Sequence, residues 1–338
     1  EYIASLFDPK ILRTRLFERN GKYSLLVWFE GNSALQSQVL LNGHLDVVPA
    51  DDESQYRLRI EGNKAFGRGT CDMKGMVAVY IAVMRELASM EVRPSVALLI
   101  NGDEEIGGED GVKWLTKEIG LRSGFVLCGD MWDEHVLNIV TKEKGGLEIE
   151  LIAEGRSAHA ADLWKGDNAI EKLMHAVNRV KRFIGKVELE TWKSTVNLAI
   201  VETSNKTYNK VPADARAVLD IRFTEELAQD PRELLKKIQA LVPEVEVRVL
   251  EMMSPFSADV HDPRIERLKE IVEKISGRRV AFASENGASD MRHFAEAGVP
   301  GVILGCIGDN GHAKDEWVDL EGLKLQKRIT LRFIKSSL

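Results

Sequence analysis

Cysteine is scarce in this sequence, and its scarcity excludes a disulfide-stabilised framework. The 338 residues contain only three cysteines, Cys71, Cys128 and Cys306, and their spacing is not that of a zinc knuckle. An odd and small number of thiols favours a reducing compartment. We therefore expect a cytoplasmic protein in which these three side chains are small, buried packing residues.

Long apolar runs and an excess of positive charge are also absent. No apolar run approaches the roughly 20 residues that span a bilayer. The opening residues EYIASLFDPK lack the charged and apolar segments of a secretion signal. The net charge is −7, which disfavours nucleic-acid binding. The composition thus predicts a protein whose partners are neither membranes nor nucleic acids.

Alternating strand-like and helix-like stretches form the first part of the chain and return near its end. Strands are predicted at 23–30, 37–42, 95–101, 124–129, 279–283 and 300–305, and helices at 75–90, 111–119, 263–275, 289–297 and 320–334. This βαβ rhythm predicts an α/β domain with a mostly parallel sheet flanked by helices.

The middle of the chain has a different pattern. Strands that alternate apolar and charged residues are predicted at 147–155, 195–202, 213–223 and 245–251, with amphipathic helices at 168–184 and 231–242. The order β-α-β-β-α-β is that of a ferredoxin-like α+β domain. We therefore predict a first domain made of residues 1–144 and 254–338, interrupted by an inserted domain, residues 145–253.

Histidines and carboxylates follow several of the predicted strands of the first domain. The set comprises His44, Asp72, Glu105, Asp130 and His312. Ligands of parallel α/β sheets bind beyond the carboxyl ends of the strands, so we expect these side chains to meet. Two histidines and three carboxylates form the ligand set of a two-metal hydrolytic site.

Charge supports this interpretation and assigns two further acids. Three carboxylates, two divalent cations and a bridging hydroxide sum to zero. Glu104, next to the ligand Glu105, is then left over as a general base. Asp46, two residues after His44, is placed to accept the other imidazole N–H and fix its tautomer. Histidine and carboxylate ligands accept zinc, cobalt and manganese, so the identity of the metal stays open, with zinc as our first expectation.

Seven segments, in order along the chain, carry a resemblance to one family. They are NGHLDVVP (42–49), GRGTCDMKG (67–75), NGDEEIGG (101–108), EGRSAHAA (154–161), NKVP (209–212) with DIR (220–222), GASDMR (287–292) and GHAKDEWV (311–318). The chain resembles the metallopeptidases that include acetylornithine deacetylase, succinyl-diaminopimelate desuccinylase, aminoacylases, glutamate carboxypeptidases and dipeptidases.

This resemblance implies roles for individual residues of the first domain. His44 and Asp130 would hold one metal ion, Glu105 and His312 the other, and Asp72 would bridge both. The family fold is a zinc-peptidase-like catalytic domain with an inserted lid and dimerisation domain. The chain begins inside what the family uses as its first helix, so we expect part of that domain's edge to lie outside this sequence.

The resemblance also implies substrate-binding residues in the insert. His159 would reach a substrate oxyanion, often in the site of a partner subunit, and Asn209 and Arg222 would grip a substrate carboxylate. Arginine suits this role because its planar fork pairs with a carboxylate through two hydrogen bonds. The partners implied are a small molecule with a free carboxylate and a second copy of the chain, joined through the lid.

The expected activity is metal-dependent hydrolysis of the amide bond of a small N-acyl amino acid or dipeptide, by a two-metal mechanism with Glu104 as base. A narrower reading is a succinyl-diaminopimelate desuccinylase or an acetylornithine deacetylase-like deacylase. Asp130 favours peptide substrates and GASDMR favours desuccinylases, so peptidase and deacylase stay open. An inactive metal-binding relative acting as a binding protein is a third possibility, which the complete residue set argues against. A regulatory α/β protein is a fourth.

Overall fold

The computed structural model describes residues 1–135, 137–186 and 191–336. The chain forms two compact units, each described here by itself. The first unit comprises Glu1–Thr141, Ala258–Ala283 and Ser289–Leu338, and the second comprises Lys142–Ser257 and Ser284–Ala288. Among the described residues, no helix has both the length and the apolar character needed to cross a membrane.

The main sheet of the first unit has a parallel centre and antiparallel flanks. Its order is β1-β2-β6-β3-β7-β16-β9, with bounds Leu12–Arg19, Lys22–Phe29, Val96–Asn101, Gln36–His44, Arg122–Cys128, Gly301–Ile303 and Ile139–Glu143. Strand β3 is parallel to both β6 and β7, and β16 is parallel to β7. All six residues of β6 are buried, as expected for a central strand covered on both faces.

The antiparallel β1–β2 hairpin at the sheet edge was not predicted in full. Strand β1 has a mostly exposed burial pattern, so it lacks the alternation that reveals a strand in a sequence. Its pairing with β2 is antiparallel, and Asn20 and Gly21 between them have φ angles of 49° and 75°. Asparagine followed by glycine in this conformation is a preferred tight hairpin turn.

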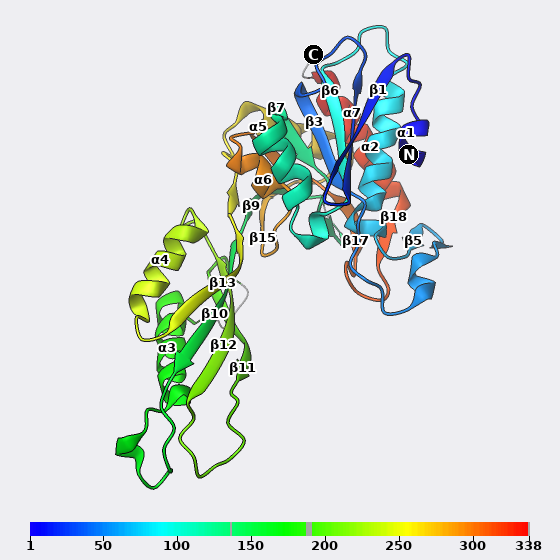
Figure 1. Cartoon of the computed structure of the whole chain (residues 1–338). Helices are drawn as coiled ribbons and strands as arrows, with labels where there is room; N and C mark the ends of the chain where they lie inside the picture. The colour runs from blue at the N-terminus through cyan, green and yellow to red at the C-terminus, as the bar shows by residue number, and fades with distance from the viewer. Residues whose placement is uncertain (136, 187–190, 337–338) are drawn as a thin grey trace. The chain divides into compact units, whose positions relative to one another are not determined.

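Helices cover this sheet and form one core with it. The larger ones are α2 (Gly75–Leu87), α5 (Pro263–Ser276) and α7 (Leu320–Ser336), and α6 (Met291–Glu296) and α1 (Tyr2–Ser5) are short. Figure 1 shows α2 and α7 side by side, and α7 also packs against α5. The helix predicted at 111–119 is instead two irregular helical turns, η4 (Glu109–Lys113) and η5 (Leu115–Ile119), because Gly111 departs from helical backbone angles. A smaller sheet has the order β4-β5-β18-β17-β8, with bounds Arg59–Glu61, Lys64–Phe66, Trp317–Asp319, Cys306–Asp309 and Trp132–Asp133.

The second unit has the predicted ferredoxin-like topology. Its antiparallel sheet has the order β11-β12-β10-β13, with bounds Thr195–Glu202, Asp214–Phe223, Gly145–Glu154 and Glu246–Met253. Helices α3 (Ala169–Ile184) and α4 (Pro231–Leu241) pack on one face of it (Figure 1). Asn168 and Asp230 cap these helices, each accepting backbone N–H groups of the first turn. Strand β11 is left at the edge of the sheet.

Candidate active site

Three neighbouring parallel strands deliver the predicted residues to one edge of the main sheet. His44 is the last residue of β3, Asp130 follows the end of β7, and Glu104 and Glu105 begin the helical turn η3 (Glu104–Ile106) after β6. Asp72 lies in η2 (Thr70–Lys74), an irregular turn before α2. Because these strands are parallel neighbours, their carboxyl ends lie together.

The side chain of His44 faces two of the predicted carboxylates. Its Nε2 lies 3.0 Å from Oδ1 of Asp72 and 3.6 Å from Oδ1 of Asp130. The ring is only 1% exposed. These three groups form one half of the site.

His312 forms the other half. Its Nε2 lies 2.8 Å from Oδ2 of Asp72 and 3.2 Å from Oε2 of Glu105. The backbone of His312 has φ +64°, a left-handed conformation that is uncommon for residues other than glycine and tends to cluster at functional sites. The two oxygens of Asp72 therefore face different histidines, so this carboxylate lies between two sets of potential metal ligands.

The electrostatics of the ligands fit a site for cations. Hydrogen bonds that His312 donates to the carboxylates of Asp72 and Glu105 raise its pKa to about 10. Burial opposes charge on His44, yet hydrogen bonds with its carboxylate neighbours raise its pKa well above the ordinary value. Burial likewise opposes ionisation of Asp72, but hydrogen bonds from His312 and His44 hold its pKa well below the ordinary value. Protons on the histidines thus balance the negative charge that divalent cations would otherwise balance.

The raised pKa of His312 predicts proton release when metal binds. A protonated imidazole cannot be a ligand, so below about pH 10 a cation must displace the proton of His312. We expect zinc added at about pH 7 to the metal-free protein to release protons, and the apparent affinity to rise with pH until the pH exceeds the pKa. A pH indicator in weakly buffered solution measures the release. A His312→Gln variant that releases as many protons as the parent protein would contradict this assignment.

Asp46 holds His44 in one tautomer, partly through an atom that was not predicted. The Nδ1–H of His44 donates to the main-chain carbonyl of Asp46 at 3.0 Å, while Oδ1 of the same residue lies 3.4 Å from Nδ1. Oδ2 of Asp46 accepts the backbone N–H of Glu105 at 2.9 Å. A proton fixed on Nδ1 leaves Nε2 available as a ligand, facing Asp72 and Asp130.

The side chain of Glu104, which is 10% exposed, lies beside the His44 half of the site. Burial, followed by the charges of Asp130 and Asp290, raises its pKa well above the ordinary value. Oxygen and nitrogen atoms of His44, Glu104 and Asp130 lie within 4.8 Å of one another, as do those of His44, Asp72 and Glu105. A carboxylate with a raised pKa next to a metal site can accept and return a proton near neutral pH.

Comparison with known proteins identifies the family. The family model described as "Peptidase family M20/M25/M40" matches residues 40–336. The chain belongs to peptidase family M20/M25/M40. It is 30% identical over 318 residues to succinyl-diaminopimelate desuccinylase of Maricaulis maris, covering 88% of this chain and 80% of that protein.

Solved structures of this family share the fold. The M20 family metallo-carboxypeptidase of Sulfolobus solfataricus has a TM-score of 0.75 at 20% identity, covering 99% of this chain and 91% of that one. A dinuclear metal-binding M20 peptidase of Bacillus subtilis has a TM-score of 0.69 at 12% identity, with 100% and 91% covered. The predicted family, fold class and activity as a metal-dependent hydrolase of amide or peptide bonds are confirmed.

Two residues of this M20/M25/M40 member, Asp290 and Arg292, hold the loop that carries Glu104 and Glu105. Asp290 accepts a hydrogen bond from Asn101 at 2.6 Å, before the loop, and Arg292 donates to the carbonyl of Gly107 at 3.0 Å, after it. Arg292 is buried, and its guanidinium lies 3.8 Å from Oε1 of Glu104. Both residues belong to GASDMR (287–292), one of the segments that carry the family resemblance, but the sequence alone assigned them no role.

The same loop requires glycine where it turns beneath the site. Gly108 has φ +66°, and a Cβ there would lie 2.6 Å from Oδ1 of Asp290 and 2.9 Å from Nε2 of His293. Asp103, the remaining acid of this run, is buried and accepts the backbone N–H groups of Asp110 and Gly111. The carboxylate of Asp103 therefore closes the loop by accepting hydrogen bonds from the loop's own backbone.

Glu316 holds the turn that carries Asp72, as Asp290 and Arg292 hold the loop that carries Glu104. Its Oε1 accepts the backbone N–H groups of Cys71 and Asp72 at 3.0 and 3.2 Å. Its Oε2 accepts from Gly69 at 2.8 Å and from Arg68 at 2.9 Å. A buried ion pair with Arg68 thus fixes the turn that presents Asp72. The segment GHAKDEWV belongs to the family resemblance, yet nothing in the sequence distinguishes Glu316 from its acidic neighbour.

The predicted substrate-binding residues of the second unit lie at two places. His159 forms an isolated bridge with Lys210, and Asn209 accepts from the backbone of Ala160 at 3.0 Å, so His159 and Asn209 are neighbours. Arg222 lies near the opposite end of β12, where its Nε donates to Asp220 at 2.9 Å. The nine residues from Asp214 to Arg222 span about 26 Å of strand. One chain therefore does not bring Asn209 and Arg222 together.

Proposed function

We propose that this chain hydrolyses the amide bond of a small N-acyl amino acid or dipeptide, using two divalent cations and Glu104 as base. The observation that carries the proposal is Asp72, whose two oxygens lie 3.0 and 2.8 Å from His44 and His312. His44 and Asp130 would hold one ion and Glu105 and His312 the other, with Asp72 between them. The Bacillus subtilis relative, described as dinuclear, supports the count.

The residues of this chain would divide the chemistry among them. Bound cations would lower the pKa of a water molecule and polarise the scissile carbonyl. Glu104 takes a proton from the attacking water and returns it to the leaving amine nitrogen. Asp46 keeps His44 in the ligand tautomer, and Arg292 holds the loop that aims Glu104. Zinc is the first candidate, followed by cobalt and manganese, since the ligand set accepts all three.

The leading substrate candidate is an N-succinyl amino acid, because a relative with 30% identity is a succinyl-diaminopimelate desuccinylase. Dipeptides come second, since solved relatives of the same fold are peptidases. We propose that Arg222 and Asn209 bind carboxylates of the substrate and that His159 stabilises the oxyanion of the tetrahedral intermediate.

A substrate panel tests this function. The metal-loaded protein is given N-succinyl, N-acetyl and dipeptide substrates matched in their amino-acid part, and the released amine is measured. We expect hydrolysis of at least one class and its loss after chelation, with recovery on adding zinc, cobalt or manganese. A protein that binds two metal ions and cleaves none of them would favour an inactive, ligand-binding relative.

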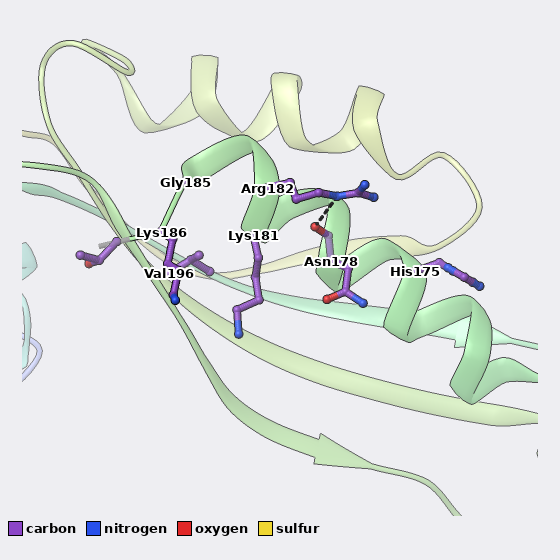
Figure 2. Close-up of a pocket in the computed structure, with 8 residues that line it drawn as sticks. His175, Asn178, Lys181, Arg182, Gly185, Lys186 and Val196 are labelled. Carbon is purple, nitrogen blue, oxygen red and sulfur yellow. Dashed lines mark hydrogen bonds between the residues drawn. The ribbon is translucent and has the colours of Figure 1, made fainter. Parts of the chain in front are cut away.

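We also propose that the chain is a homodimer joined through the second unit. His159 and Asn209 lie far from Arg222 within one chain, so serving one substrate with all three calls for a second copy. Strand β11 offers an unpaired edge, with Ile200 and Val201 exposed on it. Figure 2 shows Asn178 and Lys181 pointing from α3 toward the strands, into a hollow beside Val196 of β11. An open strand edge is a ready site for pairing with another chain.

Charges on this edge should separate the two chains. The double substitution Ile200→Lys with Val201→Lys would place positive charges on the edge of β11 and oppose edge-to-edge pairing. We therefore expect light scattering to give the mass of one chain for this protein. We expect hydrolysis to fall by about 100-fold, with metal content unchanged, because a residue supplied by the partner is lost. The control Val92→Lys replaces an exposed apolar residue of the first unit. A parent protein that is already a single chain would refute the dimer.

Arg292 should affect turnover more than binding. Arg292→Lys keeps the charge but cannot reach both Gly107 and the carbonyl of Ser289, to which the guanidinium donates at 3.0 Å. We expect kcat to fall by about 10- to 100-fold, with KM nearly unchanged, as for other residues that orient a catalytic group. Steady-state kinetics on the metal-loaded protein measures this, with exposed Arg85→Lys as control. An equal rise in KM would indicate direct substrate contact instead.

A further inference from the structure

A groove lined by basic side chains runs along helices α5 and α7 of the first unit. Its central hollow has a volume of about 650 Å³. The basic side chains around it come from both helices: Arg267, Lys274, Arg328, Arg332 and Lys335. One acid, Glu270, is among them. The charge around this hollow is therefore positive, although the net charge of the whole chain is −7.

Two neighbouring hollows share lining residues with the central one. Arg328 also lines a second hollow together with Arg278, Arg279 and Lys324. Arg267 and Ser336 also line a third, which includes Arg264. In the second hollow Lys324 is paired with Glu321, and in the third hollow Arg264 is paired with Asp262. The three hollows thus lie next to one another along these helices, and the central one, which we call the groove, carries the unpaired basic side chains.

In the described part of the chain the central basic side chains are not paired with acids. Among the residues that the structure describes, none of the five forms a hydrogen bond or an ion pair. Cations gathered around a concavity with low-dielectric walls create a positive potential that attracts anionic partners. The groove is therefore suited to a ligand that carries several negative charges.

The floor of the groove decides which kind of anion fits. It is aliphatic, formed by Ile271, Ile275 and Leu331. Within the described part of the chain, no aromatic ring lines the central hollow. Phe125 and Phe333 line the third hollow but are buried, so the bases of a nucleic acid would find no exposed stacking platform. Ile271 and Leu331 are buried, so they are recessed and cannot insert into a lipid surface as an interfacial helix does. An aliphatic floor between basic rims matches a polypeptide segment that alternates acidic and aliphatic residues.

We propose that this groove is a docking site for an acidic, aliphatic segment of a partner protein. Helix α5 has 14 residues and is therefore about 21 Å long, which accommodates a helix of about four turns. The third hollow includes Gln38 and Gly124, near the starts of β3 and β7. His44 and Asp130 lie at or beyond the ends of the same strands, so an occupied groove leaves the hydrolytic site open. The docking site does not depend on the proposed hydrolysis.

Peptide binding to the whole chain tests the proposal. The probe is a fluorescein-labelled helical peptide of about 14 residues built from glutamate, leucine and alanine, and the comparison peptide has glutamine in place of glutamate. Fluorescence anisotropy at about 50 mM salt keeps screening weak. We expect saturable binding of the acidic peptide, at least about tenfold tighter than that of the glutamine peptide, and weakening as salt is added.

Charge reversal locates the binding site. Arg328→Glu combined with Arg332→Glu should weaken binding by at least about tenfold. The matched control, Arg85→Glu with Arg93→Glu, makes the same change of charge outside the groove and should shift binding by less than about twofold. Ile275→Ser should weaken it as well. Melting temperature and amide hydrolysis, expected to be unchanged, confirm that each variant is folded.

Several results would overturn the proposal. One is equal binding of the two peptides, and another is equal weakening by the control pair. A third is tighter binding of a thymidine oligonucleotide or of phosphatidylglycerol vesicles than of the acidic peptide, which would assign the groove to a different partner.

Discussion

Glu104→Gln is expected to lower kcat by about 10³-fold while the protein keeps its metal ions, since general acid–base catalysis contributes effects of this size. Glutamine retains the shape of the side chain but accepts no proton. Glu104 is largely withdrawn from solvent, and its neighbours Asp130 and Asp290 add to this desolvation in raising its pKa well above the ordinary value. This suits a group that must take and then return a proton. Steady-state kinetics with metal analysis on the same sample measures both quantities.

Two comparisons make this test specific. Glu109→Gln, in the same loop but paired with Lys113 on the surface, should leave kcat and metal content unchanged. Because Glu104 also groups with His44 and Asp130, it could act as a ligand instead. A Glu104→Gln protein that loses metal in parallel with activity would establish that role and reject the assignment as base.

Asp72→Ala is expected to remove both metal ions, since its two oxygens face the two histidines separately. Each half of the site would lose one carboxylate oxygen as a ligand, together with negative charge that would offset the charge of the bound cation. We expect metal content after dialysis to fall to near zero, and hydrolysis to fall by more than about 10³-fold, because both carbonyl polarisation and water activation depend on the cations.

Asp130→Ala is the matched comparison for Asp72. Of the two histidines, Asp130 faces only His44, at 3.6 Å. Its loss should therefore weaken the binding of one ion and leave the ion held by His312 and Glu105 in place. Elemental analysis distinguishes the two patterns. If Asp72→Ala retained one ion as firmly as Asp130→Ala, Asp72 would not be a bridge.

Much of the fold was predictable because the relevant signals are local. Periodicity identified most of the longer strands and helices of both units, and the order β-α-β-β-α-β identified the insert before any contact was known. Strand β9 and the short strands of the smaller sheet were not predicted. Strand β1 was not predicted because most of its residues are exposed, so it lacks the alternation of apolar and polar residues that indicates a strand. The helix at 111–119 was distorted by Gly111, whose backbone angles depend on the buried carboxylate of Asp103.

The candidate site was predictable for a different reason. His44, Asp130 and Glu105 follow strands that are parallel neighbours, so topology alone brings them together. The positions of Arg292 and Glu316 could not be inferred in this way. Each acts on a segment distant in sequence, through backbone groups of Gly107 and Asp72 that no composition rule identifies. The separation of Arg222 from Asn209 follows from strand length and register, which emerge only once the sheet is paired.

The insertion of the second unit has a consequence for how the chain folds during synthesis. The second unit is nearly contiguous, Lys142–Ser257, whereas β7 of the first unit waits for its neighbour β16, since Val126 pairs with Gly301. At about 5–20 residues per second, the ribosome leaves the edge of β7 uncovered for many seconds. We expect the inserted unit to fold first, and the first unit to need protection from aggregation until α7 emerges. His312 emerges just before α7, so the proposed metal site is completed only after most of the chain has been made.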